Sequence, residues 1–350
     1  LEIEGDAYRN MSLGRILFLR GQSEEALRRL DLALREWPNN AGGRYLAGKA
    51  SVALGDVDRA LDEFQEAVRA DVDTDATLEL ALLYLNMGDP SAALRTSTLI
   101  INDPEAAAGP RLGPAILLTA RAQWDLAGNE PGRRKVARDM LEGLTKIAGH
   151  ETTAALELAR FENEESGPAA AAELLTSRPG IDPLSEEQAA VLRALCEYLV
   201  DAGDVEAALA RAEAGVERHP ESAEHQDLYA RVLGNAGRNE EAGAAFQRAL
   251  ELDPGYAPAL EGQATLLEMA GDAEAARSLL DRATELDPTN AAYPHRAAQI
   301  HLAQGRVDEA VERLNEALRR DPVHAHASND LAWILACLLY TSPSPRDRTR

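Results

Sequence analysis

The sequence predicts an all-α fold in which pairs of antiparallel helices stack into a solenoid. Glycines recur every 34 residues, and an alanine and a proline follow each at fixed distances. Between them, apolar residues recur at three- and four-residue spacing, as on the buried face of a helix. Aromatic residues make up only 4% of the chain, so aliphatic side chains and alanine must form the core. Such a core suits close-packed helices better than sheets.

The repeat is clearest over 189–324, where four sets of residues recur in phase. The sets are Gly203, Gly237, Gly271 and Gly305; Ala208, Ala242, Ala276 and Ala310; Gly215, Ala249, Ala283 and Ala317; and Pro220, Pro254, Pro288 and Pro322. A fixed period of this length is the signature of a repeat array. We therefore expect four regular repeats in this range.

Each recurring residue has a mechanical role in the predicted helix pair. Gly237 ends a first helix, because the position after a helix end often requires positive φ. Pro254 ends the second helix, since proline lacks the backbone donor. Ala230 and Ala242 are small where the two helices cross, and Phe246 fills the wider gap between them. One pair cannot bury its own apolar face, so pairs must stack.

The rest of the chain follows the same period less regularly. Gly21, Gly55 and Gly88, each followed after five residues by alanine, predict three repeats over 7–104, with 1–6 as a remnant. Two divergent repeats with longer loops are expected over 105–188, joined irregularly at GPRLGP (109–114) and SRPGIDP (177–183). A tenth repeat starts over 325–336.

The last fourteen residues, CLLYTSPSPRDRTR (337–350), break the pattern of everything before them. They resemble the translation of a transposase adapter used in preparing sequencing libraries. We interpret them as a non-native tail and exclude them from the fold. The alternative is a natural basic tail.

The 34-residue unit resembles the tetratricopeptide repeat family. The family's small residue at position 8 matches Gly14, Gly48, Ala81, Cys196, Ala230, Ala264, Ala298 and Ala332. The resemblance implies a protein of the bacterial type whose helix pairs form a right-handed superhelix. It also implies a non-catalytic scaffold that binds a peptide or protein along its concave face.

Composition excludes several classes of function. The formal net charge is -23, which argues against nucleic acid as a partner because phosphate binding needs clustered positive charge. No apolar run reaches the roughly 20 residues that span a bilayer, so we expect no direct membrane insertion. Two cysteines exclude a disulfide framework. The chain begins at Leu1 and not at Met, so its start is expected to be missing, and bacterial cytoplasm and periplasm both stay open.

Known catalytic and metal motifs fail on inspection. GNEPGRRK (128–135) lacks the Gly-Lys-Ser/Thr of a phosphate loop. DVDTDATLELAL (71–82) begins like a calcium loop, but Ala76 and Leu82 stand where glycine and glutamate belong, which favours an inter-repeat turn. We therefore predict no enzyme, no cofactor and no metal. His295 and His326 could still form a metal or pH-sensitive patch, although solvated histidines are the simpler interpretation.

The resemblance places partner contacts at positions 2, 5, 9 and 12 of the first helices. In the last repeats the candidates are Glu224, Asp227, Arg231, Glu261, Thr265, Glu268, His295, Gln299, His326, Asn329 and Trp333. Their acidic character favours a basic or neutral polar partner. Trp333 is either an anchor for that partner or a residue that lies under a further helix.

Two hypotheses stay open at this point. The chain is either a scaffold for protein partners, or the recruiting arm of a longer enzyme, sensor or envelope or polysaccharide-export protein. The absence of catalytic motifs favours the scaffold.

Reversal of Asp227 and Glu261 to lysine should weaken binding of a basic peptide at least about tenfold at low salt, because like charges then face each other. Titration of the peptide into wild type and double variant measures the effect. Unchanged affinity would remove the acidic groove.

Overall fold

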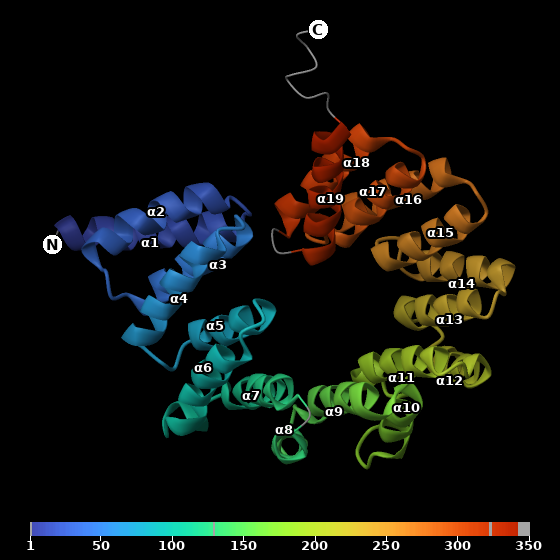
Figure 1. The fold of residues 1–350 in the computed structure, drawn as a ribbon, viewed down its shortest axis with the longest axis horizontal. Coiled ribbons are helices and arrows are strands. Elements are labelled where there is room, and N and C mark those ends of the chain that lie inside the picture. The colour runs from blue at the N-terminus through green and yellow to red at the C-terminus, as the bar shows by residue number, and fades with distance from the viewer. Residues whose placement is uncertain (1, 129, 322–323, 342–350) are drawn as a thin grey trace, which may run out of the picture. The chain divides into compact units, whose positions relative to one another are not determined.

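The computed structural model describes residues 2–128, 130–321 and 324–341. In these ranges the chain forms α-helices and two short 3₁₀ turns, and no strand (Figure 1). It divides into two compact units, Leu1–Gly203 and Asp204–Arg350, here called the N-terminal and the C-terminal unit. The predicted all-α architecture is confirmed.

The N-terminal unit holds eleven of the described α-helices and both described 3₁₀ turns. They are α1 (Glu2–Leu19), α2 (Ser23–Glu36), α3 (Ala41–Ala53), α4 (Val57–Ala70), α5 (Asp75–Asn86), α6 (Pro90–Asn102), η1 (Ala106–Ala108), α7 (Leu112–Ala127), α8 (Pro131–Leu144), α9 (Glu151–Ser166), α10 (Pro168–Ser177), η2 (Glu186–Gln188) and α11 (Ala189–Asp201), with η marking the 3₁₀ turns.

The C-terminal unit holds the other described helices. They are α12 (Val205–Arg218), α13 (Ala223–Asn235), α14 (Asn239–Leu252), α15 (Ala257–Met269), α16 (Ala273–Leu286), α17 (Ala292–Ala303), α18 (Val307–Arg320) and α19 (Ala325–Thr341).

Helices pack in chain order within each unit, which is the arrangement of a solenoid. Each helix contacts the next, and first helices of neighbouring pairs also touch, as α13 touches α15 and α5 touches α7. Every core cluster is therefore shared between consecutive helices. One joins Leu260, Leu280 and Ile300 of α15, α16 and α17. Stability comes from interfaces between neighbours, as in other repeat arrays.

A glycine with positive φ makes the tight link between the two helices of a regular pair, and in several pairs, including α15–α16, an aspartate follows it. Gly271 follows the end of α15 with φ of 87°, a left-handed conformation that glycine adopts without steric cost. Asp272 comes next and caps α16, because its side chain accepts a hydrogen bond from the backbone N–H of Ala275 at 3.1 Å. Two residues therefore end one helix and start the next.

Consecutive helices cross closely where one of them carries glycine, both within a pair and between one pair and the next. A Cβ atom built on Gly262 of α15 would lie 2.2 Å from the Phe246 ring of α14, and one on Gly48 of α3 would lie 2.5 Å from the Phe64 ring of α4. Phe64 is fully buried and Phe246 is 2% exposed. Both phenylalanines thus fill space that glycine leaves free. Phe64 does so within the pair α3–α4, whereas Phe246 fills a gap between α14 and the first helix of the next pair, α15, and not only the gap within its own pair.

The structure differs from expectation at several boundaries. Helix α1 begins at Glu2, so residues 2–6 belong to that helix and form no separate remnant. Helix α7 begins at Leu112, inside the segment expected to be a joint. The division between the units falls after Gly203, within the range expected to hold four regular repeats. Of the tail predicted over 337–350, residues 342–350 lie outside the described part.

His301 of α17 is a buried histidine in a cationic setting. It is 6% exposed, and its Nδ1 atom makes no hydrogen bond in the described part of the chain. Burial lowers the pKa of His301, and the positive charges of Arg277 and Arg306 lower it further. The folded C-terminal unit therefore holds this imidazole neutral.

A methyl group at Gly262 should destabilise the protein, because the Phe246 ring cannot move aside in a packed core. We expect Gly262→Ala to lower the free energy of unfolding by about 1–3 kcal/mol. Gly243→Ala is the matched control, since its nearest neighbour lies 4.0 Å from the added Cβ. The control should raise the free energy of unfolding by up to about 1 kcal/mol, because alanine has a higher helix propensity than glycine. Urea denaturation of the three proteins measures both effects, and equal stability of the two variants would refute the close crossing.

Acid should destabilise the fold through His301. In an unfolded chain the imidazole takes up a proton near pH 6.5, whereas the folded state resists protonation to lower pH. The unfolded state therefore binds more protons, and stability falls as the pH drops below about 6.5. Urea denaturation from pH 8 to 5 should show this loss in wild type and a smaller loss in His301→Gln. A constant difference between the two proteins over the whole range would contradict it.

Candidate functional site

The first helices of the C-terminal unit carry all the predicted contact residues, and Arg231 joins two of these helices. Its Nε atom donates to Asp227 Oδ2 at 3.0 Å within α13. Its Nη2 atom donates to Glu261 Oε2 at 3.0 Å and to the carbonyl of Pro258 at 2.9 Å, both on α15. Burial lowers the pKa of Arg231, but the charges of Asp227 and Glu261 outweigh burial and raise it above its ordinary value. Arg231 therefore stays charged.

Arg296 makes the next connection, from α17 back to α15. Its Nη2 atom donates to Thr265 Oγ1 and to Glu268 Oε2, both at 3.2 Å. Arg296 is one-third exposed and Glu268 is 40% exposed. This pair therefore lies in contact with solvent, where salt weakens it.

His295 makes the third connection, from α17 to α19. Its Nε2 atom lies 2.9 Å from Asp330 Oδ2, and its ring centroid lies 5.0 Å from that of His324 and 6.3 Å from that of His326. His324 Nδ1 accepts a hydrogen bond from the backbone N–H of Ala327, so it caps α19. The predicted pair His295 and His326 therefore lie near one another, together with His324. Their contacts hold α17 against α19.

These contacts connect α13 to α15, α15 to α17 and α17 to α19, and we call their side chains together the polar ladder. Its members are Asp227, Arg231, Glu261, Thr265, Glu268, Arg296, His295 and Asp330. Four carboxylates meet two guanidinium groups, so the ladder keeps an excess of negative charge. A carboxylate has about four acceptor sites, and one or two donors do not saturate it.

Sequence reasoning missed two members of the ladder, Arg296 and Asp330. Both stand one position after a predicted contact, at position 6 of a first helix. The available signal was charge complementarity between first helices about one repeat apart: Arg296 lies 28 residues after Glu268, and Asp330 lies 35 after His295.

Burial divides the predicted contacts into two groups. Asp227 has no exposed surface and His295 is 8% exposed, so neither meets a partner without a rearrangement. Lysine at Asp227 would also remove one of the two carboxylate partners of Arg231 and bury a second positive charge beside it, so loss of binding in that variant would report damage to the fold. Glu224, Glu268, Gln299, His326, Asn329 and Trp333 are exposed, and Trp333 is 66% exposed.

The N-terminal unit repeats the same kind of connection between first helices. Lys49 Nζ of α3 lies 2.7 Å from Glu79 Oε1 of α5. Arg121 Nη2 of α7 lies 2.6 Å from Glu157 Oε2 of α9. Ion pairs thus link neighbouring first helices in both units.

An aromatic cluster holds the divergent region together. The Trp124 ring of α7 stacks on Phe161 of α9 with centroids 4.0 Å apart, and Arg134 and Arg138 of α8 lie 5.0 and 5.4 Å from the Trp124 ring. Trp124 Nε1 also donates to Glu164 Oε2 at 2.5 Å. Stacking and cation–π contacts of this kind join the first helices α7 and α9 to the second helix α8. Trp124 is 4% exposed and is therefore a core residue.

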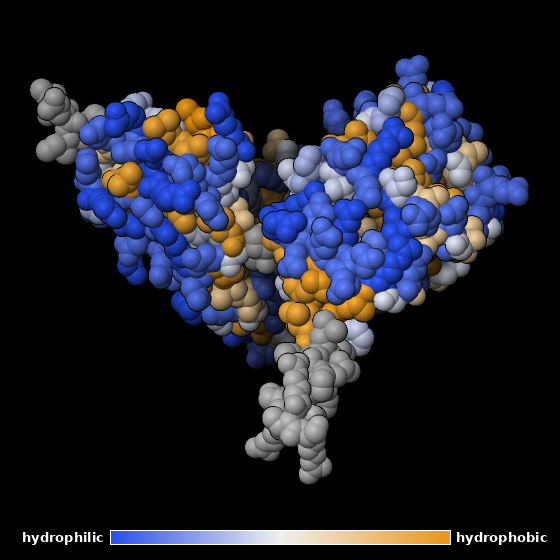
Figure 2. Space-filling model, turned by 90° about the horizontal axis from the view of Figure 1, so that it is seen from above, coloured by the Kyte–Doolittle hydropathy of each residue, from blue (hydrophilic) through white to orange (hydrophobic). Residues whose placement is uncertain are grey.

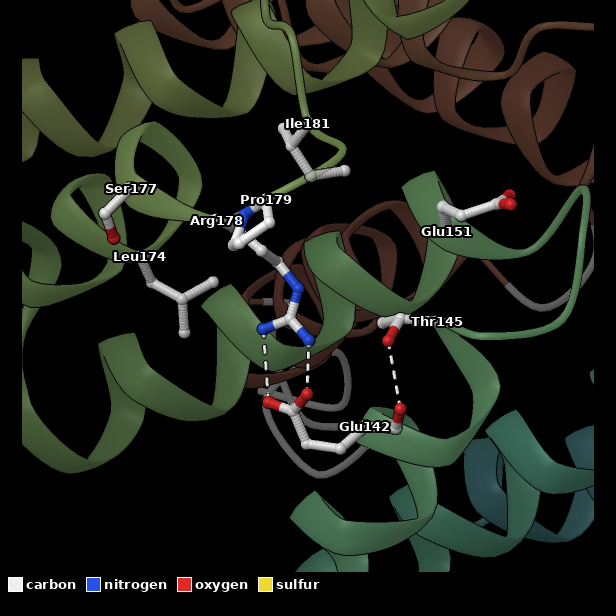
Figure 3. A pocket seen from close by; sticks show the side chains of 8 residues that line it. All are labelled: Glu142, Thr145, Glu151, Leu174, Ser177, Arg178, Pro179 and Ile181. Carbon is white, nitrogen blue, oxygen red and sulfur yellow. Dashed lines mark hydrogen bonds and ion pairs between the residues drawn. The ribbon is translucent and has the colours of Figure 1, made fainter.

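A pocket of about 430 Å³ lies in the same region of the N-terminal unit (Figure 3). It is formed by the end of α8, the start of α9, the end of α10 and the segment that follows. We call it the α8–α10 pocket. It is lined by Glu142, Thr145, Glu151, Leu174, Ser177, Arg178, Pro179 and Ile181.

The calcium-like segment is occupied by an arginine. Arg111 Nη1 lies 2.9 Å from Asp73 Oδ1, and Arg111 Nε lies 2.8 Å from Asp75 Oδ1. Asp71 Oδ1 accepts from the backbone N–H of Asp73, as in a tight turn before a helix. The segment is the turn before α5.

The described ranges show neither a metal-binding cluster nor a membrane-spanning helix. In the described ranges, no group of three or more His, Cys, Asp or Glu side chains is arranged to hold a metal ion. None of the helices described is both long and apolar enough to span a bilayer. The face drawn in Figure 2 is mostly hydrophilic, with apolar residues in small groups.

Three solved structures illustrate the similarity: a thermophilic tetratricopeptide repeat protein, MamA, and the tetratricopeptide repeat domain of P58(IPK). The thermophilic tetratricopeptide repeat protein TTC0263 of Thermus thermophilus is 22% identical over 53% of this chain and 99% of its own, with a TM-score of 0.43. MamA is 19% identical over 47% and 94%, with a TM-score of 0.35. The tetratricopeptide domain of P58(IPK) is 16% identical over 96% and 99%, with a TM-score of 0.28. Curated proteins show no significant match.

Two family models, both described as tetratricopeptide repeat, match this sequence. One matches residues 11–73 and 193–257, and the other matches 235–300 and 267–334. Together the matched residues make up more than half of the chain. The helix pairs, the glycine links and the small residues at the crossings fall in the same segments. The chain belongs to the tetratricopeptide repeat family.

Proposed function

We propose that the chain is a non-catalytic scaffold that binds a protein or peptide across the first helices of its C-terminal unit. Tetratricopeptide arrays generally act as protein-interaction modules. The polar ladder is the observation that carries the proposal here. It runs over four consecutive first helices and is bordered by the exposed side chains of Glu224, Gln299 and Asn329.

The charge of the ladder favours a basic or neutral polar partner. Glu261 is 24% exposed, Glu268 is 40% exposed and Asp330 is 29% exposed, so three carboxylates reach solvent. The arginines between them are already bound, and each holds its carboxylates in place. A lysine or arginine of the partner would add to these pairs, whereas a carboxylate would meet repulsion.

A partner with neutral groups fits the same surface through hydrogen bonds. Gln299 and Asn329 have exposed amides, which both donate and accept. Amides of this kind suit backbone groups of an extended peptide. Rim charges then set the rate of encounter, and direct contacts set the lifetime of the complex.

Reversal of Glu261 and Glu268 to lysine should weaken binding of a fluorescein-labelled (Lys-Gly-Ser)₄ peptide at least about tenfold at low salt. Asp227 stays intact, so Arg231 keeps its buried partner. Fluorescence anisotropy measures the affinity. The milder Glu261→Gln with Glu268→Gln should reduce it in the same direction and keeps the test usable if the lysine pair unfolds.

Glu240→Lys with Glu285→Lys is the matched control, because it changes the net charge equally on exposed positions of α14 and α16. This pair should bind the peptide nearly as wild type does. An equal loss in both pairs would show that the overall negative field attracts the peptide and that the ladder has no special part. A loss in neither pair would refute the proposal.

A further inference from the structure

The α8–α10 pocket exists because one second helix is short. Helix α10 has 10 residues, whereas α12, α14, α16 and α18 have 14 each. The missing last turn leaves space between the ends of α8 and α10. The segment from Arg178 to Ile181 then forms one wall of that space (Figure 3).

The segment that forms this wall is held in one conformation. Gln188 Oε1 accepts from the backbone N–H of Asp182 at 2.8 Å, and Gln188 Nε2 donates to the carbonyl of Gly180 at 3.3 Å. Gly180 has φ of 83°, which supplies the turn. One glutamine side chain therefore clamps both sides of the turn. A wall ordered in advance reduces the entropy cost of binding a ligand.

The positively charged side chain that lines the pocket, Arg178, is already paired with Glu142. Arg178 Nη1 donates to Glu142 Oε1 at 3.1 Å and Arg178 Nη2 donates to Glu142 Oε2 at 2.5 Å, a two-point ion pair. The Arg178 side chain is only 14% exposed, and Glu142 is 51% exposed. An anion would have to displace Glu142 from this pair while Glu151 repelled it. The pocket is therefore unsuited to anions.

The remaining polar groups present acceptors. Thr145 Oγ1 donates its proton to the carbonyl of Glu142 at 2.9 Å, and Ser177 Oγ donates to the carbonyl of Glu173 at 2.8 Å. A hydroxyl has a single proton, so each oxygen is left with its lone pairs. Glu151 Oε2 accepts from the backbone N–H of Gly149 at 2.8 Å, and Glu151 adds a second negative charge. Two carboxylates and one guanidinium give a net charge of about -1.

An apolar wall faces these acceptors. Leu174, Pro179 and Ile181 line the pocket beside Arg178 (Figure 3). A group that fits must be cationic, rich in donors and carried on an apolar stem. Lysine and arginine side chains have this character, because their methylene stems pack on apolar surface while the charged head stays among polar groups. The volume of about 430 Å³ admits such a side chain with part of its backbone.

We propose that the α8–α10 pocket binds a lysine or arginine side chain of a partner polypeptide. The site lies in the N-terminal unit, apart in sequence from the polar ladder, and stands independently of it. It selects for a positive side chain through the Glu142 carboxylate and the nearby Thr145 hydroxyl oxygen, while Glu151 adds negative charge from the opposite side of the pocket from Ser177 (Figure 3).

The probe is the tripeptide acetyl-Ala-Lys-Ala-amide, titrated into the full chain labelled at leucine and isoleucine methyl groups. The methyl signals of Leu174 and Ile181 should shift in a saturable manner. Acetyl-Ala-norleucine-Ala-amide keeps the stem without the charge and should bind several-fold more weakly. Acetyl-Ala-Glu-Ala-amide should produce no saturable shift.

Two substitutions test the charge in opposite directions. Glu151→Gln should weaken lysine-peptide binding roughly three- to tenfold. Glu142→Gln frees Arg178 and should exchange the preference, so that the glutamate peptide binds and the lysine peptide no longer does. Glu173→Gln of α10 is the control, with a side chain outside the pocket, and it should match wild type.

Three results would overturn the proposal. Norleucine and lysine peptides could bind equally, which would mark simple apolar adsorption. The glutamate peptide could bind wild type better, which would make Arg178 the recognition group. The Leu174 and Ile181 signals could stay unmoved at millimolar probe. A failure of the ladder alone would leave all three readouts unchanged, so the two proposals fail separately.

Discussion

The close crossing of consecutive helices is the constraint on which the rest of the structure depends. A large ring on one helix occupies space that glycine leaves open on the next, Phe64 within the pair α3–α4 and Phe246 between α14 and α15. These contacts fix the distance and angle within a pair and between pairs, and so decide which side chains of neighbouring helices meet. The core clusters and the ion pairs between first helices follow from that geometry.

Much of the fold could be predicted because it is encoded locally and repeatedly. Gly237 and Gly271 each follow the end of a first helix with positive φ, and Phe246 is buried as expected. The helix ends in the middle of the chain were harder to predict, because the repeat is irregular there and a stacked pair, Trp124 and Phe161, joins the first helices α7 and α9. No short-range pattern indicates which aromatic residue takes that part.

The candidate site was predicted less well than the fold, for a physical reason. Position in a repeat tells which face of a helix a residue occupies, and it placed Glu261 and Glu268 near one another. It does not tell which side chain on a neighbouring helix completes an ion pair. That choice depends on side-chain length and direction. The ion pair of Arg231 with the buried Asp227 and the contacts of Arg296 and Asp330 were therefore not predicted.

The serial contact of helices also has a mechanical consequence. Within the N-terminal unit each helix touches mainly its neighbours in the chain, so a pulling force passes through one interface after another. Such a unit extends like springs in series, and its softest joint sets its compliance. The interface between α8 and α9, which is the sparsest between consecutive α-helices of this unit and borders the α8–α10 pocket, is that joint. A ligand that fills the pocket would therefore stiffen the unit against bending.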